Sequence, residues 1–225
     1  MKNRRSYTLI EIMVVMALAA VLVTISLPAF SALMRGNSAA ITCSKVKGVL
    51  DQAQARAVTD RRYVATVIDM TGAVSGLANT QALRNCYVSS GYAFQSWVEE
   101  SEWVPLDQDA QVLVFGLGES GSSPTFPNNG STPVPAANSV QTVGNVVGAG
   151  GTHDLSGWVF SMYGAVKEPH NNFYIGVGEA TLANGVYIYK NVDGSGRPGN
   201  VMALTVNHFT GRSQVAAIGS DGKIE

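Results

Sequence analysis

The distribution of hydrophobic and charged positions divides the chain into two parts. From Ile12 to Met34, 23 consecutive residues carry no charge. As an α-helix such a run extends over about 34 Å, which is enough to cross a bilayer core of roughly 30 Å. After Arg35, charged and polar residues recur along the chain. The pattern predicts an apolar helix over residues 7–34, followed by a region with a polar surface.

The segment over residues 35–62 has helical periodicity and is predicted to continue this helix, with a flexible point at Gly36–Asn37. Its apolar side chains recur at intervals of three and four residues, at Val46, Val49, Leu50, Ala53 and Ala57. This spacing places them in one stripe along the helix. An amphipathic helix buries such a stripe, so we expect it to pack against a sheet.

Short runs of β-branched and aromatic residues follow, separated by turn-forming residues. They predict strands at residues 63–68, 92–98, 111–115, 158–162, 173–177, 186–189, 201–206 and 214–217. Residues 120–152 carry no charge and are rich in Gly, Ser, Pro and Asn, which predicts a long loop insertion. The predicted fold class is α+β, with a long N-terminal helix packed on a mostly antiparallel β-sheet domain over residues 63–225.

The amino-acid composition makes some classes of function less plausible than others. The chain has 15 Lys+Arg against 16 Asp+Glu, and only 14% of its residues are charged. This balance argues against a basic nucleic-acid-binding protein and favours an exported β-rich domain. The two cysteines, Cys43 and Cys86, have no zinc-ligand spacing. They could form one disulfide in an oxidising compartment, and two unpaired thiols remain the alternative.

The N-terminal apolar segment allows several interpretations. Lys2, Arg4 and Arg5 precede it, so the positive-inside rule keeps the N-terminus in the cytoplasm and exports the rest. A cleaved secretory signal, with a site at Ala29–Phe30–Ser31, a plain membrane anchor and a buried core helix are three alternatives. None of them requires Glu11, whose carboxylate costs a few kcal/mol when it is buried in a membrane. Glu11 is therefore interpreted as functional.

The sequence Ser6-Tyr7-Thr8-Leu9-Ile10-Glu11 resembles the processing motif of type IV pilins and type II secretion pseudopilins. The resemblance implies that prepilin peptidase removes a leader of residues 1–6 by cutting between Ser6 and Tyr7, after which Tyr7 is N-methylated. Ser6 stands where the family usually has Gly. Pro28 matches the proline that kinks the helix of these proteins. The implied location is a single pass through the bacterial inner membrane, with the C-terminal domain in the periplasm.

Cleavage gives Glu11 a physical role. The new ammonium group of Tyr7 in one subunit could pair with the buried Glu11 of a neighbouring subunit. A buried charge is costly when it is unpaired and much less costly when it is paired. Glu11 would therefore favour one axial offset between subunits. Removal of the leader also removes three cations, leaving 12 Lys+Arg against 16 Asp+Glu.

A narrower resemblance extends over the rest of the chain. It consists of LDQAQARAVTDRR (50–62), WVPL (103–106), VFSMYGA (159–165) and ALTVNHFTGRSQV (203–215). In this order the segments are similar to GspH/FimT-type minor pseudopilins. The resemblance implies a structural subunit of a type IV pilus or type II secretion pseudopilus. Such a subunit works with other pilin subunits, near the filament tip, in assembly priming or protein secretion.

A second hypothesis is a pilus-associated binding module for DNA uptake or surface adhesion. Some FimT-type proteins are linked to DNA through a Gly-Arg-x-Arg hairpin, and Arg212 occupies the first arginine position. Gln214 stands at the second, and phosphate contacts need clustered cations, so DNA ranks below a structural role. His153, His170 and His208 lack ligand spacing. No catalytic constellation stands out, so we expect no enzyme activity, cofactor or metal.

Overall fold

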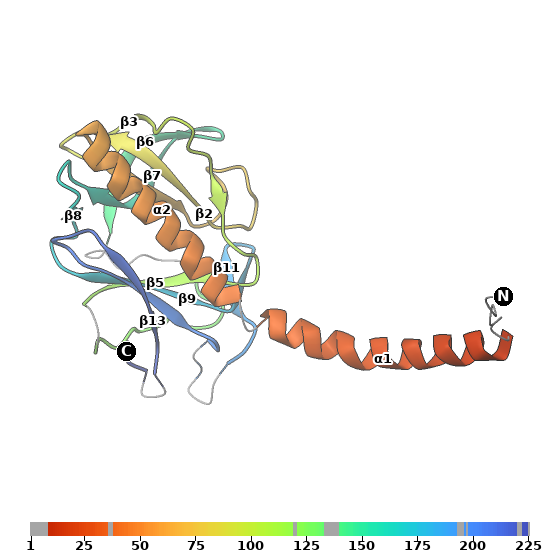
Figure 1. The fold of residues 1–225 in the computed structure, drawn as a ribbon. Helices are drawn as coiled ribbons and strands as arrows, with labels where there is room; N and C mark the ends of the chain where they lie inside the picture. The colour runs from red at the N-terminus through yellow and green to blue at the C-terminus, as the bar shows by residue number, and fades with distance from the viewer. Residues whose placement is uncertain are drawn as a thin grey trace, which may run out of the picture. The chain divides into compact units, whose positions relative to one another are not determined.

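The computed structural model describes residues 9–35, 38–118, 121–132, 140–192, 196, 198–219 and 222–224. The chain forms two compact units, Met1–Asn37 and Ser38–Glu225. The first contains helix α1, Leu9–Arg35. The second contains helix α2, Ser38–Asp60, and the β-strands. Figure 1 shows α2 lying across the strands of the second unit, which confirms the predicted α+β class.

The second unit is built from thirteen strands among the described residues. Their bounds are β1 Tyr63–Asp69, β2 Ala82–Val88, β3 Phe94–Trp97, β4 Val104–Pro105, β5 Gln111–Leu117, β6 Gln141–Gly148, β7 Gly151–Phe160, β8 Val166–Glu168, β9 Phe173–Gly178, β10 Ala180–Ala183, β11 Val186–Tyr189, β12 Met202–Val206 and β13 Ser213–Ala217. The eight predicted strands all overlap with strands of this set. The β2, β4, β6, β8 and β10 strands were not predicted.

The strands pair into two principal sheets. One has seven strands in the order β3-β2-β1-β7-β6, with β4 added beside β2 and β8 beside β7. The other has four strands in the order β13-β12-β9-β5, and β10 pairs with β11. The pairings between these strands are antiparallel, as predicted.

The core lies between α2 and the two sheets. The predicted helical stripe is the buried one, because Val46, Val49, Leu50, Ala53 and Ala57 are all buried there. From the sheets, Trp158 contributes the largest fully buried side chain. Its ring stacks on Phe173 with centroids 6.0 Å apart and lies 5.2 Å from the ring of Phe115. Apolar burial of this extent on both partners holds the helix on the sheets.

The structure corrects the prediction for residues 120–152. Gln141–Gly148 form β6, which pairs with β7 in a hairpin that turns at Ala149–Gly150. Val143 and Val146 of β6 are fully buried. The register shifts between these two valines, where Asn145 has a φ of 60°. Asn accepts the left-handed conformation of such a bulge more readily than most residues, so this polar-looking segment can still form a strand.

The turn after β1 is organised by one buried carboxylate. Asp69 accepts hydrogen bonds from four backbone N–H groups, those of Thr71 (3.2 Å), Gly72 (2.9 Å), Val74 (2.8 Å) and Ser75 (2.7 Å). Hydrogen bonds to a charged acceptor are stronger than those between neutral groups. They satisfy the carboxylate in a site where only 1% of the residue is exposed. The turn therefore has a fixed shape without a helix or strand to hold it.

Candidate assembly site

Helix α1 has an apolar surface that is exposed within its own unit. The exposed large hydrophobic residues are Leu9, Ile10, Ile12, Met13, Val14, Val15, Met16, Leu18, Val21, Leu22 and Val23. A helix that is hydrophobic all round is normally covered by a membrane or by other protein. Because these side chains are exposed in the described part of the first unit, α1 is a candidate assembly element.

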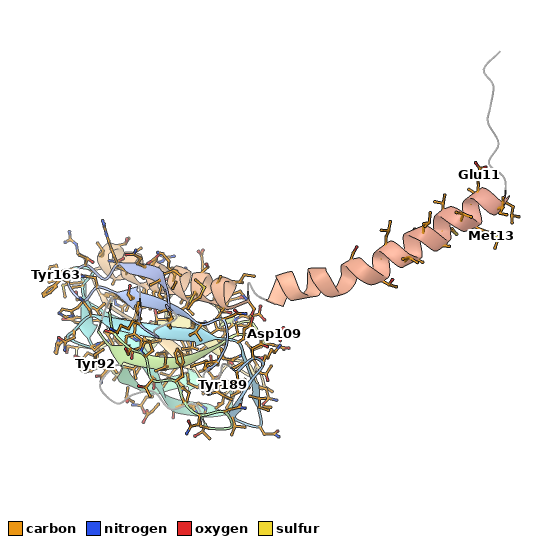
Figure 2. All side chains as sticks on the ribbon, turned by 90° about the horizontal axis from the view of Figure 1, so that it is seen from below. Glu11, Met13, Tyr92, Asp109, Tyr163 and Tyr189 are labelled. Atoms are coloured by element: carbon orange, nitrogen blue, oxygen red, sulfur yellow. The ribbon has the colours of Figure 1, made fainter. Side chains whose placement is uncertain are left out.

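Glu11 lies in the first turn of α1, on this apolar surface. Together with Ile12, Val15 and Met16 it lines an open depression of about 490 Å³. Figure 2 shows Glu11 and Met13 projecting from the N-terminal end of the helix. A carboxylate with apolar neighbours is suited to bind a cation that is itself surrounded by apolar groups. Contact between the two apolar surfaces removes water from both charges, and this strengthens their attraction.

Two hydroxyl groups further along α1 are satisfied within the helix. Thr24 donates from Oγ1 to the carbonyl oxygen of Val21 at 2.8 Å, and Ser26 donates from Oγ to that of Leu22 at 2.7 Å. Such bonds to the preceding turn allow small polar side chains to lie in an apolar environment. These two positions therefore remain compatible with a covered helix.

The other predicted processing residues are only partly within the described chain. Ser6 and Tyr7, which flank the predicted cut, lie outside the described residues. Helix α1 continues through position 28, so the kink expected at Pro28 stays a prediction. Among the described residues, no helix meets the length and hydropathy expected of a membrane span. The single pass through the inner membrane therefore also stays a prediction.

The hairpin that carries Arg212 joins β12 to β13. Beside it lies a groove of about 420 Å³, lined by Asn172, Thr205, Val206, Asn207, Arg212, Ser213 and Gln214. Among the described residues of this lining, Arg212 is the one that is charged, and the other polar groups are amides and hydroxyls. One cation gives weak recognition of a phosphate backbone, which depends on several Lys and Arg side chains acting together.

The structure does not form the disulfide considered for Cys43 and Cys86. Both thiols are free and buried. Cys43 of α2 belongs to the cluster between the helix and the sheets. Cys86 of β2 belongs to a second cluster with Ala65 and Val67, on the other face of the seven-stranded sheet. The two-residue alternation of a strand explains the separation, because Cys86 points away from the face that α2 covers.

Both thiols are expected to resist alkylation in the folded protein. Burial raises the pKa of Cys43 and of Cys86 to about 12, so only about one thiol in ten thousand is ionised at pH 8, and the thiolate is the reactive form. We expect maleimide to label neither thiol of the full chain in detergent micelles, and to label both after denaturation. Rapid labelling before denaturation, or a mass that increases on reduction, would contradict this assignment.

Two of the three histidines lie near each other in the described chain. His170 and His208 approach with ring centroids 6.1 Å apart, and His208 also contacts the ring of Phe209 at 4.9 Å. His153 lies elsewhere, with Nε2 3.0 Å from the carbonyl oxygen of Ala149. Within the described residues, His, Cys, Asp and Glu do not gather into a group of three that could hold a metal ion.

Comparisons with known proteins found a sequence motif and a similar solved structure. The prokaryotic N-terminal methylation motif matches residues 1–27, which confirms the predicted prepilin-type motif. The minor pseudopilin EpsH of the type 2 secretion system of Vibrio cholerae has a similar structure, with a TM-score of 0.42, 14% sequence identity, and coverage of 81% of this chain and 99% of that chain. No protein of curated function matches the chain by sequence. The motif supports the resemblance to the type IV pilin and pseudopilin superfamily.

Proposed function

We propose that this chain is a minor pilin or pseudopilin of GspH/FimT type, a structural subunit of a type IV pilus or type II secretion pseudopilus. One observation carries the proposal. The methylation motif at residues 1–27 overlaps helix α1, whose exposed apolar surface is interrupted near its start by the carboxylate of Glu11. A membrane anchor alone would need the apolar surface but not the carboxylate.

In the proposed mechanism, prepilin peptidase cuts between Ser6 and Tyr7, and the new N-terminus is methylated. Before assembly, the mature chain is anchored in the bacterial inner membrane, with residues 63–225 in the periplasm. On assembly, α1 moves from lipid into contact with the helices of other pilin subunits. The ammonium group of Tyr7 in one subunit then pairs with Glu11 of its neighbour, which stabilises one axial offset and disfavours the others.

The second unit has the proposed role of contacting partners, near the filament tip, for assembly priming or protein secretion. Its core supports this role because α2 is packed firmly on the sheets through Val46, Leu50 and Ala53, each at most 1% exposed. A rigid unit presents its surface loops in fixed positions, which lowers the entropy cost of binding. DNA capture ranks below this role, since Arg212 is the one cation among the described residues that line the groove beside its hairpin.

Fractionation tests the proposal in cells that make the protein. We expect the chain to sediment with sheared filaments, or with the membrane fraction that holds the pseudopilus, together with other pilin-type subunits. In cells without prepilin peptidase it should stay in the membrane as a longer precursor. A chain that is found in the soluble fraction in both kinds of cell would contradict the proposal.

A further inference from the structure

The groove beside the hairpin of β12 and β13 has a polar lining that the proposed function does not use. Its side chains come from adjacent strands of the four-stranded sheet. Asn207 donates its backbone N–H to the carbonyl oxygen of Arg212 at 3.0 Å, and Thr205 lies opposite Gln214. Because side chains alternate between the two faces of a sheet, these four residues share one face. All four also line the groove of about 420 Å³.

This face of the sheet is the one that points away from α2. Val206 and Ser213 alternate with the four groove residues and point to the opposite face. Val206 is buried in the cluster between α2 and the sheets, and Ser213 donates from Oγ to Asp51 of α2 at 2.6 Å. Asp51 also pairs with Lys47. The carboxylate of Asp51 is therefore separated from the groove by the sheet, and the described lining contains no Asp or Glu.

The turn between β12 and β13 fixes the amide groups at one end of the groove. Oδ1 of Asn207 accepts hydrogen bonds from the backbone N–H and the hydroxyl of Thr210, at 3.0 and 3.1 Å. Oδ1 of Asn172 accepts one from the backbone N–H of His208 at 2.7 Å. Since the turn occupies the oxygen of Asn207, its NH₂ group, with two donors, is the part that can serve a ligand.

Arg212, Gln214 and Thr205 complete a set of donors and acceptors. Among the described residues, no carboxylate pairs with Arg212, whose planar guanidinium matches a carboxylate in two parallel hydrogen bonds. Gln214 is exposed and offers both a donor and an acceptor. Thr205 donates from Oγ1 to the carbonyl oxygen of Gln214 at 3.3 Å, which leaves its own oxygen as an acceptor. The groove thus combines one cation with neutral groups that donate and accept.

This combination fits some ligands poorly. Nucleic acid needs several cations for its phosphates, and the described lining offers one. A protein interface centres on aromatic and other apolar side chains, whereas Val206 is the one apolar residue among the described lining residues. A ligand with one carboxylate and several hydroxyl groups, by contrast, could use every kind of polar group in the groove, because each hydroxyl both donates and accepts.

We propose that this groove binds a sugar acid, a sugar ring that carries one carboxylate. Arg212 pairs with the carboxylate, while Thr205, Asn207 and Gln214 exchange hydrogen bonds with the ring hydroxyls. The groove volume of about 420 Å³ is within the range of roughly 300–1,000 Å³ for small-molecule sites. The inference goes beyond the proposed function, since it requires only the folded second unit.

Saturation-transfer difference NMR tests the proposal with the full chain, in micelles of a detergent without a sugar head group. Three probes separate the parts of the ligand. Galacturonate carries both the carboxylate and the ring hydroxyls, galactose has the ring without the carboxylate, and acetate has the carboxylate without the ring. We expect galacturonate to bind about tenfold or more tightly than either of the others, because hydrogen bonds to charged groups are the stronger ones.

Three variants test the position of the site. Arg212→Gln should weaken galacturonate binding about tenfold and leave galactose binding unchanged. Gln214→Glu places a carboxylate in the groove and should also weaken galacturonate binding. Lys45→Gln is the matched control, because it removes a cation that bonds to the carbonyl oxygen of Pro105 on β4, outside the groove. It should leave the affinity unaltered.

Four outcomes would overturn the proposal. Galacturonate could fail to bind the unsubstituted chain. Galactose could bind as tightly as galacturonate, which would show that Arg212 is not used. Acetate or inorganic phosphate could bind as tightly, which would show a site for any small anion. Arg212→Gln could act no differently from Lys45→Gln, which would place the binding outside the groove. None of these results depends on leader cleavage or filament assembly.

Discussion

Glu11→Ala is expected to block incorporation of the chain into filaments while leaving membrane insertion and leader cleavage intact. Glu11 is the only charged side chain between Arg5 and Arg35. Without it, the ammonium group of the neighbouring Tyr7 would be buried without a partner. Breaking a buried charge pair from one side costs about 3–5 kcal/mol, which corresponds to a loss of about a hundredfold or more in the equilibrium. The amount of chain in sheared filaments, relative to that in the membrane, measures the effect.

Two further variants distinguish the loss of the Tyr7–Glu11 charge pair from other effects of the substitution. Glu11→Asp keeps the charge on a shorter side chain and should retain part of the incorporation. Glu100→Ala removes one negative charge from an exposed turn of the second unit and should leave incorporation unchanged. Normal incorporation of Glu11→Ala would refute the pairing mechanism, because the apolar surface of α1 would then be sufficient for assembly.

Trp158→Ala is expected to lower the free energy of unfolding by about 3–5 kcal/mol, the range for large aromatic residues removed from a core. Trp158 is fully buried between α2 and the sheets, with Phe115 and Phe173 against its ring. Its removal would leave a cavity that these neighbours cannot fill without breaking their own contacts. Denaturant unfolding of the full chain in detergent micelles, followed by far-ultraviolet circular dichroism, measures the loss.

Trp103→Ala is the matched control, because Trp103 is only partly buried at the sheet edge, where its ring lies 5.4 Å from that of Trp97. The same change in side-chain chemistry should cost clearly less there. Trp158→Phe retains an aromatic ring in the core and should fall between the two. Equal losses for Trp103→Ala and Trp158→Ala would show that the core is not centred on Trp158.

The helical periodicity was sufficient to predict how α2 packs. Its five apolar stripe positions are the ones that the structure buries, because a 3.6-residue repeat fixes which side chains share a face. Runs of β-branched and aromatic residues likewise predicted the positions of strands such as β1, β5 and β9. The methylation motif was also readable, since its residues are consecutive in sequence.

Strand β2 shows why other elements were not predictable. Arg84 and Asn85 interrupt its apolar pattern. Asn85 is nevertheless buried, because its side chain accepts a hydrogen bond from Thr66 Oγ1 at 2.8 Å and donates one to the carbonyl oxygen of Val49 at 3.1 Å. Arg84 places its guanidinium 4.0 Å from the ring centroid of Trp97. These partners come from distant segments, so local sequence alone does not identify them.

The most direct test of the account is the intact mass and N-terminal sequence of the protein isolated from its native membrane fraction. The account predicts a chain that starts at Tyr7, with one added methyl group on its amino nitrogen. A chain that starts near Ala32 would contradict it, because an ordinary secretory signal would have been removed and α1 would be lost. A chain that retains Met1 would also contradict it, since neither the new ammonium group nor its pairing with Glu11 could then exist.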